Sequence, residues 1–132
     1  MIGETFEDLK CWQSAYRLKQ RIREEVIPNF PKEERYELTS QLVRATRSAT
    51  ANISEGWGRF HFLESRKFYF NSRGSQAEVI DHLMEARDYG YISSELYNSI
   101  RANVIESIKI LNGYIRYLTS KSGTRNPGKD DG

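Results

Sequence analysis

Cysteine, proline and long apolar runs are scarce in this 132-residue sequence. Each scarcity excludes some structures or sites. Cys11 is the only cysteine, so the chain can form neither an internal disulfide nor a cysteine-based zinc site. We expect its thiol to be buried and the compartment to be reducing. No segment approaches the roughly 18 consecutive apolar residues of a membrane span, and the acidic first residues lack the pattern of a signal peptide. We therefore expect a cytoplasmic protein that binds no membrane.

Motifs for catalysis and metal binding are also missing. His61 and His82 are the only histidines, and neither stands three residues after a glutamate, as the ligands of di-metal bundles do. The sequence has no phosphate-binding glycine loop, no dinucleotide turn and no nucleophile elbow. We therefore expect no enzymatic activity, no cofactor and no metal. A metal-dependent enzyme that uses Glu55, Glu78 and His82 is the alternative, and metal analysis would test it.

The three prolines, Pro28, Pro31 and Pro127, leave long stretches free of helix breakers. Apolar residues recur in these stretches at helical spacing, which predicts helices over residues 7–27, 32–55, 63–89 and 93–118. The short connections predict an all-α, antiparallel up-down-up-down four-helix bundle. Residues 1–118 would form this one domain. Residues 119–132 lack apolar side chains after the last helix and would form a disordered polar tail.

A run of small residues before Gly56 predicts an unusually close helix contact. Ala45, Ser48, Ala49 and Asn52 would share a face that is too thin for an ordinary core and suits two closely approaching backbones. Gly74, inside the next helix at a cost of about 1 kcal/mol relative to alanine, is expected to lie opposite. The predicted structural polar layer comprises Ser48, Asn52, Glu55, Gly74, Ser75 and Glu78. The alternative is that these groups are half-exposed and solvated.

The net charge is only +2, but the predicted topology would gather charges of opposite sign at opposite ends. Between positions 44 and 73, six basic residues accompany two acids, whereas between positions 78 and 95 one basic residue accompanies five acids. A basic end with aromatic neighbours suits RNA, because rings stack on unpaired bases while arginines meet phosphates. The alternative is a charge pattern that serves solubility alone. The predicted nucleic-acid-binding residues are Arg59, Arg66, Lys67, Arg44, Arg47, Arg73, Trp57 and Phe60.

Three aromatic residues, Phe68, Tyr69 and Phe70, are consecutive on the predicted third helix. Successive helical positions differ by about 100°, so one bundle core accommodates one or two of these rings. The remaining ring would meet solvent, RNA or another subunit. We expect a homo-oligomer, since exposed amphipathic aromatics are typical of protein interfaces; burial at the edge of the core is the alternative.

Three parts of the sequence resemble a known family. They are the opening Phe6-Glu7-Asp8-Leu9-Lys10-Cys11-Trp12-Gln13-Ser14-Ala15, the run Ala51-Asn52-Ile53-Ser54-Glu55-Gly56 with Arg44, Ser48 and Arg59, and the set Phe68, Arg73-Gly74-Ser75, Glu78 and Leu83 before Tyr89-Gly90-Tyr91-Ile92. Over residues 6–118 the chain is similar to the bacterial four-helix-bundle proteins encoded in intervening sequences of 23S ribosomal RNA genes. The accessory protein Avd of diversity-generating retroelements is a relative of that family.

The resemblance implies a homopentamer of four-helix bundles with a basic surface. For the retroelement relatives it implies binding of nucleic acid and of a reverse transcriptase, and for the intervening-sequence members a role related to RNA. The chain departs from the family pattern at Ala49-Thr50, where the family usually has Ile-Pro, and at Asn71-Ser72, where it has an apolar residue and alanine. The sequence thus predicts a non-enzymatic, oligomeric RNA-associated bundle. The alternative is a scaffold whose basic end docks a protein such as a reverse transcriptase.

Overall fold

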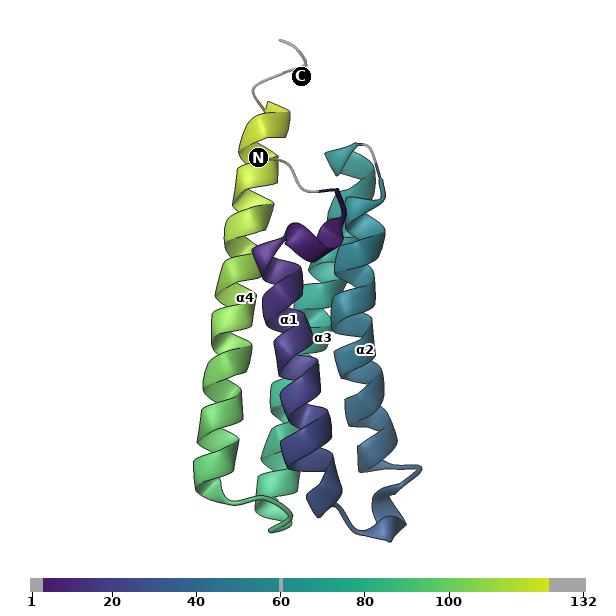
Figure 1. The fold of residues 1–132 in the computed structure, drawn as a ribbon, viewed down its shortest axis with the longest axis vertical. Helices are drawn as coiled ribbons and strands as arrows, with labels where there is room; N and C mark the ends of the chain where they lie inside the picture. Colours follow the sequence, from purple (N-terminus) through teal and green to yellow (C-terminus); the bar gives the residue numbers. More distant parts are fainter. Residues whose placement is uncertain (1–3, 60, 124–132) are drawn as a thin grey trace.

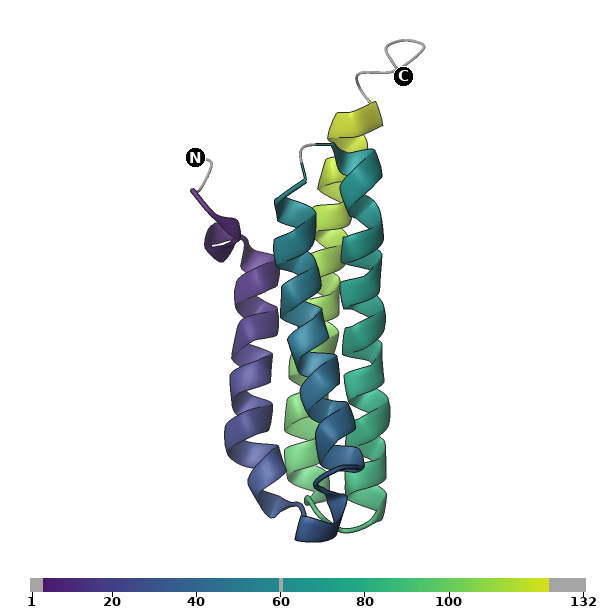
Figure 2. The ribbon, with the colours of Figure 1, turned by 90° about the vertical axis from the view of Figure 1, so that its right-hand side faces the viewer.

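The computed structural model describes residues 4–59 and 61–123. Within them the chain forms four α-helices and no strand: α1 (Lys10–Arg21), α2 (Leu38–Trp57), α3 (Phe62–Asp88) and α4 (Ser94–Gly123). The helices lie side by side along one long axis (Figure 1, Figure 2). The predicted all-helical, four-helix fold is confirmed.

Each helix packs against two others. α1 contacts α2 and α4, and α3 contacts the same two helices from the other side of the bundle. The connections from α1 to α2 and from α3 to α4 lie at one end (Figure 1). The last turn of α2, the first turn of α3 and the end of α4 lie at the opposite end, which we call the upper end. Residues that are far apart in the sequence therefore meet at the upper end.

The first two helices differ from the expected bounds. A 3₁₀ turn, η1 (Phe6–Asp8), precedes α1, and α1 continues through a π turn, η2 (Ile22–Val26), into the 3₁₀ turn η3 (Ile27–Asn29). The segment expected to open the second helix is another 3₁₀ turn, η4 (Lys32–Glu34), and α2 begins only at Leu38. The Leu38 N–H donates to the Glu34 carboxylate at 3.1 Å. The Tyr91 hydroxyl donates to the same carboxylate at 2.8 Å. Glu34 thus ties the start of α2 to the connection before α4.

The fourth helix is longer than expected. α4 continues to Gly123, past the predicted boundary at 118. The prediction of a disordered tail is therefore wrong for residues 119–123, and the rest of the predicted tail lies outside the described residues. In this last turn and a half the Thr119 hydroxyl donates to the Ile115 carbonyl at 2.8 Å. The end of α4 is thus helical although it has little apolar surface to bury.

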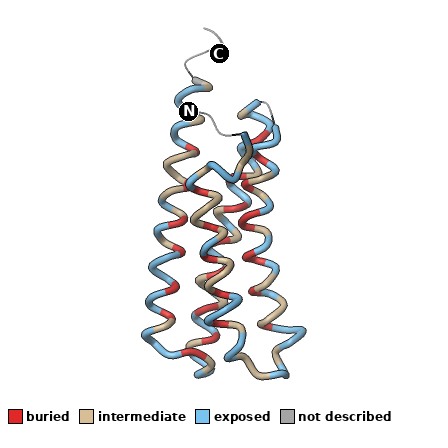
Figure 3. Tube along the Cα trace, viewed as in Figure 1, coloured by how far each residue is buried: buried red, intermediate tan, exposed pale blue. Residues whose placement is uncertain are grey.

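Buried residues occur along the length of all four helices (Figure 3), and the apolar ones form two clusters. The lower cluster comprises Leu18, Ile22, Val26, Leu38, Leu42, Ala45, Val79, Leu83, Ala86, Ile92, Tyr97, Ile100 and Val104. The upper cluster comprises Cys11, Ala15, Ile53, Tyr69, Leu111 and Ile115. Between them, each of α2, α3 and α4 contributes buried polar residues, a set that we call the polar belt: Thr46, Thr50, Ser72, Gln76 and Ser107.

The polar belt is not the polar layer that the sequence predicted. In the belt, the Ser72 hydroxyl donates to the Ala49 carbonyl at 2.7 Å, and the Gln76 amide donates to Ser72 Oγ at 3.3 Å. Gln76 Oε1 and Ser107 Oγ are buried without a hydrogen-bond partner among the described residues. The prediction missed this belt because serine and glutamine at core positions look, in sequence, like exposed residues.

The predicted layer exists only in part, at the edge of the α2–α3 contact. The Ser75 and Ser48 hydroxyls are 2.8 Å apart, and the Asn52 amide donates to Ser48 Oγ and to the Ser48 carbonyl at 2.9 Å. All three residues are half-buried. Glu78 is exposed, and Glu55 instead pairs with an arginine at the upper end. Most of the predicted layer therefore fits the alternative, in which these groups are half-exposed and solvated, better than it fits a layer across the bundle.

The glycine that permits a close helix contact is Gly56, not Gly74. A Cβ atom on Gly56 would lie 2.7 Å from Cζ of the Tyr69 ring, too close for any side chain to fit without movement. A Cβ on Gly74 would meet no described atom within 4 Å. The predicted close approach at Gly74 is therefore wrong within the subunit. Spacing alone does not show which of two glycines faces the neighbouring helix.

We predict that Gly56→Ala destabilises the fold by about 1–3 kcal/mol, because the new methyl group displaces the buried Tyr69 ring. Gly113→Ala is the matched control, since its Cβ would lie 3.8 Å from Arg116 Nη2, an ordinary contact. It should be neutral or stabilise by up to about 1 kcal/mol through helix propensity. Urea unfolding of both variants measures the difference. Equal stability of the Gly56→Ala variant and the parent would contradict the close contact.

Cys11 is expected to resist thiol reagents in the folded protein. Burial raises the pKa of its thiol from 9.0 to about 12, so near pH 8 the reactive thiolate is about 1,000-fold rarer than in an ordinary cysteine. Titration with a chromogenic disulfide reagent should show slow labelling that becomes fast in denaturant. Rapid labelling of the native protein at the rate of a free thiol would show that Cys11 is accessible.

Candidate nucleic-acid interface

The structure gathers three of the six predicted cations at the upper end. Arg59, Arg66 and Lys67 follow α2 or lie in the first turns of α3, and all three side chains are exposed. Trp57, the last residue of α2, is 38% exposed beside them. Phe60, also predicted here, lies outside the described residues. No carboxylate of the described chain pairs with Arg66 or Lys67.

Arg59 is positioned by two neighbours. Its Nη2 lies 2.6 Å from Oε2 of Glu55, one helical turn earlier, and its guanidinium lies 4.9 Å from the centre of the Phe68 ring. The ammonium of Lys67 approaches the same ring at 5.2 Å. Because the two partners of the ion pair are 45% and 50% exposed, the pair contributes at most about 1 kcal/mol. A phosphate group can therefore replace Glu55 at small cost.

A cavity of about 310 Å³ opens beside Arg59 at the upper end. Its walls include the rings of Trp57, Phe62, Tyr69 and Tyr114, so α2, α3 and α4 all contribute. The Tyr69 and Tyr114 rings meet edge to face at 5.5 Å and 88°. Burial raises the pKa of both phenols, which stay neutral at physiological pH. The cavity thus offers aromatic surface and neutral hydroxyls next to a cation.

The other three predicted cations lie elsewhere. Arg73, midway along α3, donates to Asn112 Oδ1 of α4 at 2.8 Å and covers the Phe70 ring at 5.0 Å. Arg44 and Arg47 lie nearer to the opposite end of α2, and both are exposed. Among the described residues, neither Arg73 nor Arg44 pairs with Glu55 or Glu78. Asn112 is the partner of Arg73 instead, and it holds α3 to α4.

Comparison with known families identifies the chain's relatives. Residues 7–113 match the family described as 23S rRNA-intervening sequence protein, which is most of the chain. The chain belongs to this family. A comparison with curated proteins found no match. Membership agrees with the resemblance of the three sequence segments.

In this member of the 23S rRNA-intervening sequence family, sequence reasoning missed several residues around Trp57. Phe6 lies 6.2 Å from Trp57 and 5.2 Å from Trp12, ring centre to ring centre. Tyr114, within the expected helix, lines the cavity, and Lys121 also lines it because α4 extends beyond its expected end. The tyrosines near the end of the last helix were the sequence signal that could have indicated these cavity residues. The sequence did not show where that helix ends.

Two other classes of site can be checked directly. Among residues 4–59 and 61–123, no three His, Cys, Asp or Glu side chains gather as metal ligands would. None of the described helices has a stretch long and apolar enough to cross a bilayer. His82, which the metal-enzyme alternative used, is half-buried on α3.

Proposed function

We propose that the protein is a non-enzymatic, homo-oligomeric bundle that binds unpaired RNA at its upper end. One observation carries this proposal: three exposed cations stand beside an aromatic-lined cavity at a single end of the subunit. Arg66 and Lys67 supply charge that no carboxylate of the described chain neutralises, and Arg59 can exchange its exposed partner for phosphate. Membership in the intervening-sequence family supports RNA as the ligand.

The cations and the aromatic rings of the upper end would bind different parts of an RNA strand. Phosphate contacts give affinity without sequence preference, and stacking of bases on aromatic rings adds about 1–3 kcal/mol per base. The partly exposed Trp57 ring suits a base that is splayed out of a helix. The Tyr69 and Tyr114 phenols that line the cavity stay neutral, so they do not repel a phosphate.

Assembly of several subunits would strengthen such weak contacts. The outer face of α3 carries Leu63, Phe70, Ala77 and Met84 at intervals of seven residues, and all four are exposed. A shallow hollow beside Phe70 contains Gly74 and Ser75, so another backbone can approach there. We propose that this face forms the subunit contact of the homopentamer that the resemblance implies. A ring of subunits would present several RNA sites at once and bind by avidity.

Replacing Arg66 and Lys67 with glutamate should weaken RNA binding strongly. The double variant loses about two phosphate contacts, so the slope of log affinity against log salt should become less steep by about 1.4. Fluorescence anisotropy with a labelled single-stranded RNA over a salt series measures both effects. The control is Arg101→Glu with Lys109→Glu, two exposed cations of α4 with the same change in charge.

Equal effects of the two double variants would contradict an RNA site at the upper end. If RNA binding is unaffected by either change, the basic end instead acts by docking a protein such as a reverse transcriptase. Circular dichroism and solution mass of each variant should match the parent, because all four side chains are exposed.

Phe70→Glu combined with Met84→Glu should dissociate the assembly, because both charges would be buried at the proposed contact. Light scattering should then give the mass of one chain, 15.4 kDa, in place of a multiple. Tyr36→Glu is the control, since Tyr36 is 79% exposed before α2 and away from this face. A parent protein with the mass of one chain, or an assembly that survives the double change, would refute the proposed contact.

A further inference from the structure

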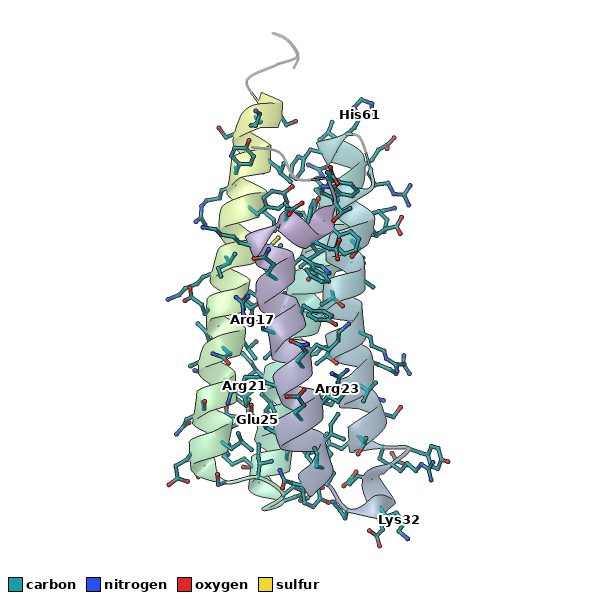
Figure 4. All side chains as sticks on the ribbon, viewed as in Figure 1. Arg17, Arg21, Arg23, Glu25, Lys32 and His61 are labelled. Carbon is teal, nitrogen blue, oxygen red and sulfur yellow. The ribbon has the colours of Figure 1, made fainter. Side chains whose placement is uncertain are left out.

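Three cations, among them the predicted Arg47, line a second cavity that does not include Arg59, Arg66 or Lys67. Lys19 of α1, Arg23 of η2 and Arg47 of α2 line a cavity of about 210 Å³, and no carboxylate lines it. Figure 4 shows Arg23 on the side of α1 that faces α2, whereas Arg17 and Arg21 lie on the side that faces α4. The structure thus gives Arg47 partners in an α1–α2 site.

Lys19 is held in place at this cavity. Its ammonium donates to Thr50 Oγ1 at 2.9 Å, which leaves two N–H donors for another acceptor. Burial, followed by the charges of Arg47 and Arg23, lowers the pKa of Lys19. The one described carboxylate that pairs with any of the three cations is Glu24, 3.9 Å from Arg23 and 66% exposed. The three positive charges therefore repel one another, and a bound anion would relieve that repulsion.

A row of aromatic rings leads from this cavity to the upper end. Lys19 lies over the Tyr16 ring at 5.2 Å, and Trp12 stacks on Tyr16 at 4.7 Å with an interplanar angle of 19°. Phe6 then joins Trp12 to Trp57 through edge contacts of 5.2 and 6.2 Å. Positions 12, 16, 19 and 23 share one face of a helix by spacing. The cations at one end of this surface are therefore followed by a continuous row of rings.

We propose that the Lys19–Arg23–Arg47 cavity binds a backbone phosphate of single-stranded RNA, whose neighbouring nucleotides contact Tyr16 and Trp12. Cations combined with neighbouring aromatic surfaces are the arrangement that binds single strands without sequence preference. The two arginines offer forked donors to the phosphate oxygens, and Lys19 adds a point charge. This inference rests on the proposed function and extends it, because the RNA would run from Trp57 down the α1–α2 face.

The test compares two triple variants that remove the same charge. Lys19→Gln, Arg23→Gln and Arg47→Gln together empty the cavity of cations, and the control changes the exposed Arg17, Lys109 and Arg116 to glutamine. Anisotropy with a fluorescein-labelled oligouridylate of about ten nucleotides should show affinity about ten-fold or more lower for the cavity variant, and a salt slope less steep by about 0.7, the value for one phosphate contact. The control should change affinity less than about three-fold. Equal weakening by both variants would overturn the site.

A second experiment tests phosphate binding at the cavity independently of RNA binding. Inorganic pyrophosphate added to ¹⁵N-labelled parent protein should shift the amide signals of Thr46, Arg47 and Thr50, and the same signals should stay fixed in the cavity variant. If the parent binds no RNA but pyrophosphate shifts these signals, the proposed function fails and the phosphate cavity stands. If RNA binds while the cavity variant equals the control, the proposed function stands and this inference fails. No response to either ligand would overturn both.

Discussion

The close packing of α2 against α3 determines where the candidate functional residues of the upper end lie. Gly56 leaves room for the Tyr69 ring, and the Ser72 hydroxyl donates directly to the Ala49 carbonyl. These contacts bring the ends of the two helices together at the upper end. Arg59 and Lys67 consequently meet over Phe68, and Tyr69 forms the floor of the aromatic cavity. A bulkier residue at position 56 would separate the helices and disperse this constellation.

The polar belt separates the two apolar clusters of the core. Below it, a large apolar cluster joins residues of all four helices and supplies most of the hydrophobic stabilisation. Above it, the smaller upper cluster includes Tyr69, which also lines the cavity. Buried polar atoms without a protein partner, such as Gln76 Oε1, cost about 1–3 kcal/mol each. The candidate RNA site lies above the belt, beside the smaller apolar cluster.

Much of the fold followed from the sequence, but less of the site did. Helical periodicity and three prolines sufficed for four helices, because both signals are local. The bounds of α2 and α4 were missed since Glu34 caps α2 through its side chain and α4 continues without apolar residues. Arg59, Arg66 and Lys67 lie near one another because they are also close in sequence. Arg47 was assigned to the wrong neighbours, because its partners Lys19 and Arg23 belong to another helix.

The sequence by itself determined the family, the helical class and the number of described helices, since each depends on motifs or on spacing along one segment. Only the tertiary structure decided which glycine admits a ring, which polar residues enter the core, and which cations share a cavity. Those outcomes depend on how each helix is rotated about its axis and aligned with its neighbours. Rotation and alignment are settled by the simultaneous packing of all four helices, in which a shift of one residue moves a side chain by about 100°.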